Sequence, residues 1–561
     1  MKKVVSVVLV ILMCVTYLSS CVRRPDLPDV IDTTNTESET FKDEEIKDET
    51  PKDETPKDET PKDETPKDET PKDETPKDET PKDEPQEPSI PPELIVNVPP
   101  TDFAAKFSPE NEALLETILA SPIKEVSSVE NVLPSLTVNP SKKYASGDGG
   151  YTYIYGNVGK AIYDNTCHVL FKNGFAKYTE NAINAGADDD ETWKLYNYSA
   201  TFINDTAQID IDLHTGTNRM FINVTPRASS VLPQREAKSY VKPQGNYPTL
   251  WVQYGLEDID DKESSLGYII RIADGSFIIV DGGELIDGVE VRMYEILKKL
   301  APDPDNIVIS AWIITHTHGD HVGGFLKFAD KYINDPTIKV KQIVCNFPDD
   351  TKIPKSNNGE DSWEKILQDH VREYSKTFGA EFLKVQTGNV LYYADIKINI
   401  LYTQANYLDS NVDGMMSNFN GASVVTQFVM ADGSKVLVGA DHPVDGTYNG
   451  VVWCQNALVR WYGTGLRSQV VSTFHHGYGG GADNYIYGVI KPQKVLWGVD
   501  YARVTASSLT TFSHNKYFTT NGKANNVTYH MASGSSVTIL QFANGTPTLT
   551  FYSTFSEFKA S

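Results

Sequence analysis

Two periodicities of apolar and polar residues divide the second half of the chain into strands and helices. Residues 267–275 and 276–283 alternate with a period of two and meet at Asp274-Gly275, which predicts a β-hairpin. Apolar residues spaced three or four positions apart predict amphipathic helices over 289–300 and 363–378. Further apolar runs predict strands over 307–315, 396–401, 423–430, 435–442 and 470–474. Strand pairs that alternate with helices predict a two-sheet α/β sandwich with helices on its outer faces.

The preceding stretch carries a separate pattern. Amphipathic helices are predicted over 110–120 and over 160–175, the second of them closed by Gly174. Alternating strands are predicted over 151–156, 193–203, 207–214 and 219–226. These elements predict a small α+β domain with a role in recognition or packing. Its two isolated histidines, His168 and His214, are expected at surface or core positions rather than as metal ligands.

The first residues carry a targeting signal. Two lysines precede an apolar stretch over residues 4–18, which is too short for an ordinary membrane span. Leu18-Ser19-Ser20-Cys21 then resembles the lipobox of bacterial lipoproteins, in which the cysteine thiol receives diacylglycerol and becomes the new N-terminus. An ordinary signal peptide or an uncleaved anchor is the alternative. In each case we expect export, and lipidation of Cys21 would hold the protein on the extracellular face of the cell membrane.

A charged repeat follows the signal. The pentapeptide KDETP occurs seven times between Lys47 and Pro81. It offers no apolar residue for burial, and its prolines interrupt both helices and strands. We therefore expect a disordered acidic spacer, extended by its charge and its prolines. The spacer also accounts for most of the formal net charge of −25, because residues 25–93 carry 26 acidic and 9 basic side chains.

These patterns divide the chain into four parts. The predicted boundaries are 1–21 for the signal peptide with its lipobox, 22–99 for the spacer, 100–240 for the α+β domain and 248–556 for the sandwich. The acidic balance and the lack of a Lys/Arg cluster argue against nucleic acid as a partner. Apart from Cys14 and Cys21 in the predicted signal, the chain has three cysteines, Cys167, Cys345 and Cys454. This is an odd number without CxxC spacing. They are expected as single thiols rather than as disulfides or zinc ligands.

The strongest chemical signal lies directly after the apolar strand at 307–315. Residues 315–324 read THTHGDHVGG, so that His316, His318, Asp320 and His321 fall within six residues. A loop with this spacing can direct alternate side chains at one metal ion and the next pair at a second one. Four ligand-competent residues at this spacing have no packing reason to be together. The motif therefore predicts a binuclear metal centre.

The motif resembles the HxHxDH signature of the metallo-β-lactamase superfamily, and the resemblance extends over residues 249–555. It implies the four-layer αββα sandwich of that fold. By this resemblance His316 and His318 bind the first metal, whereas Asp320 and His321 bind the second.

Other positions of the chain also match the family. Asp441 follows the run VLVGA and is implied to bridge the two metals. In the His475-His476-Gly477 segment, His476 is favoured as a further ligand of the second metal, and His475 as a hydrogen-bond donor to the developing oxyanion. Asp281, in the sequence VDGG, is implied to orient the metal ligands by contacting them without binding the metal itself.

One family position has no match. Most members carry another histidine between HxHxDH and the bridging aspartate, where this chain has only His370. His370 lies among apolar residues of the predicted helix 363–378, which favours a core residue over a ligand. Residues 418–425, NFNGASVV, instead resemble a run in the hydrolase-like domains of bacterial DNA-uptake channel proteins, where His-His-Gly is also typical. Asn420 is thus expected beside the first metal, where an amide oxygen completes a ligand shell only weakly.

The resemblance implies a hydrolase with two divalent metal ions, of which zinc is the first choice and manganese or iron are alternatives. A water shared by the metals would be the nucleophile, held in line by Asp320, and His475 or Tyr478 would stabilise the developing charge. Phosphodiester-type bonds in a small molecule or a cell-wall polymer are the favoured substrates. The alternatives are a lactone or carboxylic-ester hydrolase on the same centre, and a non-catalytic cell-wall binding lipoprotein with a vestigial site. The sequence does not indicate an oligomeric state.

Replacement of Cys21 by serine should move the protein from the membrane fraction to the soluble fraction, because the hydroxyl group cannot take the place of the lipidated thiol. Cell fractionation followed by immunoblotting measures this redistribution. Cys14→Ser, inside the apolar stretch, is the matched control and should stay with the membrane. Unchanged membrane retention of the Cys21 variant would contradict lipidation.

Overall fold

The computed structural model describes residues 107–561 except for 188–193, 234, 236–246, 257–258, 260–265, 357, 411–415, 417–418, 443–445, 449–450, 454, 478–483, 499–527 and 532–534. The predicted signal peptide with Cys21, the repeat spacer, Cys454 and Tyr478 lie outside the described residues. Residues Pro91–Ser561 form one compact unit. Every helix in its described part is too short or too polar to span a membrane.

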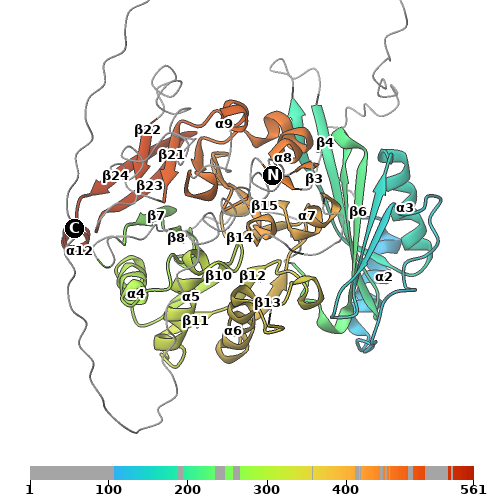
Figure 1. The fold of residues 1–561 in the computed structure, drawn as a ribbon, viewed down its shortest axis with the longest axis horizontal. Coiled ribbons are helices and arrows are strands. Elements are labelled where there is room, and N and C mark those ends of the chain that lie inside the picture. Colours follow the sequence, from blue (N-terminus) through green and yellow to red (C-terminus); the bar gives the residue numbers. More distant parts are fainter. Residues whose placement is uncertain are drawn as a thin grey trace, which may run out of the picture. The chain divides into compact units, whose positions relative to one another are not determined.

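An antiparallel sheet precedes the sandwich. Its strands lie in the order β1 (Lys142–Ala145), β2 (Tyr151–Gly156), β6 (Arg219–Pro226), β5 (Ala207–His214), β4 (Lys194–Ile203) and β3 (Ala176–Ala187). One face packs against α3 (Lys160–Lys172) through apolar side chains that include Tyr163 and Ile222. Leu115 of α2 (Pro109–Ala120) packs against Ala176 and Ile203 at one end of β3 and β4. Figure 1 shows α2 and α3 beside this sheet.

Two larger sheets form the sandwich. The first has the order β13 (Glu381–Lys384), β12 (Gln342–Cys345), β10 (Ile307–Ile313), β9 (Phe277–Asp281), β8 (Gly267–Arg271), β7 (Leu250–Tyr254), β23 (Val537–Ala543) and β24 (Thr546–Tyr552), and β11 (Ile338–Val340) also pairs with β10. The second has the order β14 (Val390–Tyr393), β15 (Ile396–Tyr402), β16 (Val425–Val429), β17 (Lys435–Val438), β20 (Val470–Ser472), β21 (Lys494–Trp497) and β22 (Thr528–Met531). Their facing side chains form one apolar core that includes Ile278, Ile398 and Val438.

Helices cover the outer faces of both large sheets (Figure 1). The helices α4 (Val289–Leu300), α5 (Gly319–Tyr332) and α6 (Trp363–Phe378) share a core with the first sheet, centred on residues such as Trp312. The helices α7 (Gln404–Ser410), α8 (Gln455–Tyr462) and α9 (Asn484–Ile490) share another core with the second sheet. Each large apolar side chain buried in these cores contributes about 1.5–3 kcal/mol. The predicted α/β four-layer αββα sandwich is confirmed.

The sandwich brings several polar segments to the ends of parallel strands. In the first sheet β9 and β10 run parallel, and in the second sheet β17 and β20 run parallel. Asp281 is the last residue of β9, and the HxHxDH motif begins just beyond β10. Asp441 follows β17 and His475 follows β20 after equally short connections. The carboxyl ends of strands from both sheets therefore supply the residues of the predicted metal centre.

The antiparallel sheet meets the sandwich through a buried polar face. Along β5, Ile209 and Ile211 point into the core with α3, whereas Asp210, Asp212 and His214 lie on the opposite face at 3% exposure or less. Burial raises the pKa of Asp210 despite the hydrogen bonds that its carboxylate accepts. The imidazole ring of His214 forms an ion pair with Asp212 and lies 4.1 Å from the ring of Trp461 in α8.

Hydrogen bonds cross this junction. Asn197 Nδ2 donates to Trp461 O at 2.9 Å, and Ser199 Oγ donates to Gly388 O at 2.6 Å. Asn389 Nδ2 donates to Asp210 Oδ1 at 3.2 Å. The face of the sheet opposite α3 therefore packs against the sandwich, both through these hydrogen bonds and through the apolar side chain of Ile183.

The structure contains several elements that the sequence analysis did not predict, among them β1 and β3. The sequence of β3, AKYTENAINAGA, alternates only weakly because two register shifts interrupt its pairing with β4. The HxHxDH segment was expected as a loop, but α5 begins at Gly319, so that Asp320 and His321 belong to its first turn. By contrast, the predicted helix 363–378 coincides with α6.

Replacement of Asn197 by leucine should lower the free energy of unfolding by about 2–4 kcal/mol, because it leaves Trp461 O and Thr215 N–H buried without partners. Thermal or urea unfolding measures the change. Asn173→Leu is the matched control, since Asn173 makes only an exposed bond within its own helix end. Equal midpoints for the two variants would contradict the stabilising role of the junction.

Candidate metal centre

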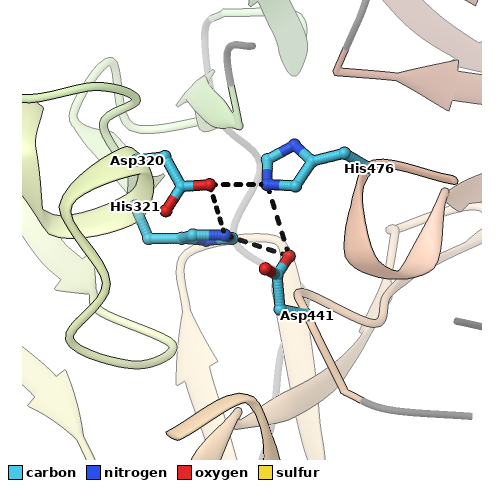
Figure 2. A group of neighbouring side chains, drawn as sticks. All are labelled: Asp320, His321, Asp441 and His476. Atoms are coloured by element: carbon cyan, nitrogen blue, oxygen red, sulfur yellow. Dashed lines mark ion pairs between the residues drawn. The ribbon is translucent and has the colours of Figure 1, made fainter. Parts of the chain in front are cut away.

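Four side chains from three separate segments converge on one point (Figure 2). Asp320 and His321 come from the first turn of α5, Asp441 from the end of β17 and His476 from the end of β20. His321 Nε2 lies 3.0 Å from Asp441 Oδ1, and His476 Nε2 lies 3.0 Å from Asp320 Oδ2. We call these four residues the second cluster, because they coincide with the predicted ligands of the second metal.

Three side chains form the first cluster, namely His316, His318 and Asp441. His316 Nε2 lies 3.1 Å from His318 Nδ1 and 4.0 Å from Asp441 Oδ2. Metal–ligand bonds of about 2.0–2.1 Å in a tetrahedron place neighbouring ligand atoms roughly 3.3 Å apart. Asp441 belongs to both clusters, with Oδ1 toward the second and Oδ2 toward the first. The structure thus assembles every predicted ligand, including the shared carboxylate.

The donor set of both clusters fits divalent cations. Imidazole nitrogens and carboxylate oxygens are ligands of zinc, manganese and iron. His321 Nε2 and Asp441 Oδ1 are buried atoms that have no hydrogen-bond partner among the described residues. They face each other across 3.0 Å, so a cation bound by both would satisfy them together.

Asp281 fixes the orientation of His321 from behind. Its Oδ2 accepts a hydrogen bond from His321 Nδ1 at 2.9 Å and another from the Thr315 hydroxyl at 2.8 Å. Its Oδ1 accepts from Thr315 N–H at 2.8 Å. Because Nδ1 donates to Asp281, Nε2 is the ring nitrogen that faces the second cluster, and it would bind a metal ion after loss of its own proton. The position predicted for Asp281 behind the ligands agrees with this geometry.

Two hydroxyl groups that the sequence analysis did not assign hold the ring of His316. Thr315 Oγ1 lies 3.2 Å and Ser423 Oγ 3.4 Å from His316 Nδ1. Val424 N also donates to Thr315 O at 3.0 Å, which ties the two segments together. Thr315 directly precedes the HxHxDH motif, and Ser423 belongs to the run NFNGASVV. Their position next to these motifs was the only sequence feature that could have predicted their contact with His316.

Close backbone contacts hold α5 against the end of β9. A Cβ atom on Gly324 would lie 2.2 Å from Gly282 O, and one on Gly323 would lie 2.2 Å from Leu285 N. Only glycine fits at these distances. The DGG and VGG sequences therefore let the first turn of α5 approach the strand ends, where it presents Asp320 and His321.

Left-handed backbone turns aim several of the site residues. Asp281, Ala440, His475 and His476 have φ angles of 53°, 47°, 48° and 51°. Such conformations cost about 1–3 kcal/mol each for residues other than glycine and persist where the surroundings enforce them. Here His475 N donates to Ala440 O at 2.8 Å, and Trp497 Nε1 donates to His476 O at 2.7 Å. These contacts hold the two adjacent histidines in different directions.

His475 and Asn420 stand beside the first cluster. His475 Nε2 lies 3.8 Å from Asp441 Oδ2 and 3.3 Å from Asn420 Nδ2, and its side chain is 22% exposed. Asn420 lies in η6 (Phe419–Ala422), and the ring of Phe419 is 6.3 Å from that of His318. Among the described His, Cys, Asp and Glu side chains, His475 is not part of the group formed by His316, His318 and Asp441, whose ligand atoms all lie within 4.8 Å of one another.

The charges of the site shift its pKa values in opposite directions. Burial lowers the pKa of His321, but the carboxylates of Asp441, Asp320 and Asp281 outweigh it and raise that pKa well above its usual value. Burial raises the pKa of Asp441, but the neighbouring imidazoles outweigh it and hold that pKa well below its usual value. The pKa of His316 is lowered by burial and by His321. The carboxylates are thus ionised at neutral pH and attract positive charge.

Three further histidines in the described part of the chain lie outside both clusters. His370 of α6 is half-buried, with its ring 6.3 Å from that of Tyr374. The expectation of a core position was therefore wrong, because Leu367 and Val371 occupy the buried face of the helix instead. His168 is exposed and His214 is buried, as expected for residues without a metal role.

Comparisons with known proteins agree with the architecture. Residues 261–385 match the family described as "Metallo-beta-lactamase superfamily", so this segment carries a domain of that superfamily. A search of curated proteins found no match.

Solved structures with a similar fold are distant. The metallo-beta-lactamase fold protein YhfI from Bacillus subtilis has 12% identity and a TM-score of 0.30, over 52% of this chain and 99% of that chain. CmlA, a diiron beta-hydroxylase from Streptomyces venezuelae, has 12% identity and a TM-score of 0.32, over 53% of this chain and 54% of that one. A possible metal-dependent hydrolase from Veillonella parvula has 12% identity and a TM-score of 0.27, over 52% and 99%. Likenesses at this distance carry no information on the substrate or the metal of this chain.

Replacement of Gly324 by alanine should push α5 away from β9, lower the free energy of unfolding by about 1–3 kcal/mol and reduce the metal content. Gly319→Ala on the same helix is the control, because its Cβ atom would meet only Glu284 Oε1 at 3.9 Å. Metal analysis and thermal unfolding of both variants measure the effect. Full metal content in the Gly324 variant would show that the close contact does not position the ligands.

Proposed function

We propose that the protein is a cell-surface, metal-dependent hydrolase that acts on phosphodiester-type bonds. The observation that carries this proposal is the pair of clusters joined by Asp441, with His475 and Asn420 at the side of the first cluster. Paired divalent cations at such spacing are typical of enzymes that cleave phosphate esters.

Two divalent cations, with zinc as the first choice, would be held by the first and second clusters. Bound there, they would supply an activated water nucleophile and a Lewis acid that polarises the scissile bond. The first cluster offers three side chains, which leaves a coordination position for a substrate oxygen, as catalytic zinc sites require.

The side chains of this chain would orient the reactants. Asp320 is 29% exposed and ionised, so its carboxylate can accept a hydrogen bond from the attacking water and hold it in line. Asn420 Nδ2 and His475 Nε2 lie 3.3 Å apart, so a substrate oxygen placed beside this pair could accept N–H hydrogen bonds from the amide, and from the imidazole in its Nε2–H tautomer, as negative charge develops. Burial lowers the pKa of His475 despite the nearby Asp441, which favours the neutral imidazole.

Phosphodiesters are favoured over lactones for two reasons. The run NFNGASVV and the His475-His476-Gly477 segment resemble the hydrolase-like domains of DNA-uptake channel proteins. A phosphate centre also presents several oxygens at once, which suits two cations and a nearby pair of N–H donors. Lipidation of Cys21 and the acidic spacer would place this site outside the cell membrane, near small-molecule or cell-wall polymer substrates.

The proposal is tested with the purified protein in two steps. Metal analysis should give two equivalents per chain, and a panel of phosphodiester, lactone and β-lactam substrates should show the highest kcat/KM for a phosphodiester. Preference for a lactone would move the activity to carboxylic esters on the same centre. Lack of turnover with every substrate in the fully loaded protein would support a binding protein and overturn the proposal.

Ligand substitutions separate the roles of the individual side chains. His318→Ala and Asp441→Ala should lose metal and activity together, because each removes a ligand and Asp441 serves both clusters. Asn420→Ala should weaken the metal of the first cluster more than that of the second. His370→Gln is the control and should keep the metal content, with at most a modest loss of stability. Metal-to-protein ratios decide the matter, and loss of metal only in the His370 variant would overturn the ligand assignment.

A further inference from the structure

The metal centre draws its residues from both large sheets. His321 lies just beyond β10 of the first sheet, whereas Asp441 and His476 lie just beyond β17 and β20 of the second sheet. Atoms from the two sheets come close together, since His321 Nε2 lies 3.0 Å from Asp441 Oδ1. A functional site of this kind tolerates a misplacement of only about 0.5 Å. The two sheets must therefore be held in one position relative to each other.

Apolar packing constrains that position less closely than hydrogen bonds do. Most side chains between the two sheets are apolar, among them Ile278, Ile398 and Val438. The hydrophobic effect depends on the buried area and has no direction, whereas a hydrogen bond requires a defined distance and angle. Polar side chains that cross from one sheet to the other are therefore the groups that can fix the position.

Two neighbouring polar residues of the first sheet reach the second sheet. Gln253 of β7 and Tyr268 of β8 are directly paired with each other in the first sheet. The Tyr268 hydroxyl donates to Ser472 Oγ of β20 at 2.8 Å, and Gln253 Nε2 donates to Trp497 O of β21 at 2.8 Å. All four residues are at most 2% exposed. Two buried hydrogen bonds thus join adjacent strands of one sheet to adjacent strands of the other.

These polar side chains carry a cost that apolar ones would not. A buried amide or hydroxyl group is unfavourable unless it is hydrogen-bonded, so apolar side chains of similar size would fill the same space without that requirement. Burial raises the pKa of Tyr268 above its usual value, so its hydroxyl keeps the proton that it donates. What Gln253 and Tyr268 add to the contact between the sheets is therefore direction.

Both hydrogen bonds end beside the segment that carries His476. Ser472 is the last residue of β20, shortly before that histidine. Trp497 Nε1 donates to His476 O at 2.7 Å, and a Cβ atom on Gly477 would lie 2.4 Å from Trp497 Cζ2. Gln253 holds the backbone of Trp497, whose indole ring in turn holds the backbone of His476. The first sheet thus reaches a predicted ligand that belongs to the second sheet.

We propose that Gln253 and Tyr268 are positioning residues of the metal centre. Through their hydrogen bonds to the second sheet they hold His476 at the distance from Asp320 and His321 that a shared cation requires. The inference rests on the metal centre of the proposed function but not on hydrolysis. Metal binding alone tests it, so its failure and the failure of the proposed hydrolysis are distinguishable.

The test is a zinc titration of the purified full-length protein, stripped of metal, in competition with a chromogenic chelator. Tyr268→Phe and Gln253→Leu should each weaken the binding of at least one zinc ion by roughly tenfold or more, as is usual for outer partners of a metal site. Tyr462→Phe and Gln427→Leu are the matched controls and should keep the parental zinc affinity. Their side chains are equally buried, but their hydrogen bonds stay among the elements around the second sheet.

A double variant separates positioning from stability. Tyr268→Phe combined with Ser472→Ala removes both partners of one hydrogen bond, so its thermal midpoint should return close to that of the parent. Its zinc affinity should stay as weak as that of Tyr268→Phe, because no directional contact replaces the bond. Parental zinc affinity in this double variant would overturn the proposal.

Two further results would also overturn it, namely parental zinc affinity in both single variants and equal losses of affinity in the two controls. A parent protein that binds no zinc would contradict both this inference and the proposed function. Zinc binding without turnover of any substrate would contradict the proposed function alone.

Discussion

The burial of carboxylates among imidazoles is the constraint on which the metal centre depends. Asp281 is fully buried and Asp441 is 2% exposed. An ionised carboxylate out of water costs several kcal/mol unless donors or positive charge compensate it. Thr315 and His321 compensate Asp281, whereas Asp441 faces imidazole nitrogens on both of its oxygens. The glycine contacts and left-handed turns around the site hold these groups in an arrangement that a cation completes.

The sandwich could be predicted because its elements have one apolar and one polar face. Helix α6 and the β8–β9 hairpin follow directly from their periodicity. β3 could not, because two register shifts interrupt its alternation. The helix α5 was also not predicted, since its first turn coincides with the HxHxDH motif and Gly323 and Gly324 are poor helix formers.

The residues of the site differ in how far their role could be predicted from the sequence. The HxHxDH motif and the family resemblance gave the candidate ligands, including Asp441 and His476, and the structure brings these side chains together. The hydroxyl groups of Thr315 and Ser423 carry no characteristic spacing, and only the fold shows that they hold His316. Asn420 illustrates the intermediate case. Its place beside the first cluster could be expected, but its contact with His475 depends on turns that sequence does not specify.

The junction between the antiparallel sheet and the sandwich limits how modular this chain is. Ile183 of β3 belongs to the apolar core under α8 and α9, and the backbone of Asn184 lies against Gly465 so closely that no side chain would fit between them. A sandwich excised near residue 248 would expose both this apolar patch and unpaired polar groups. The sheet is therefore an integral wall of the sandwich rather than an appended module, and the two have to be expressed and exchanged as one piece.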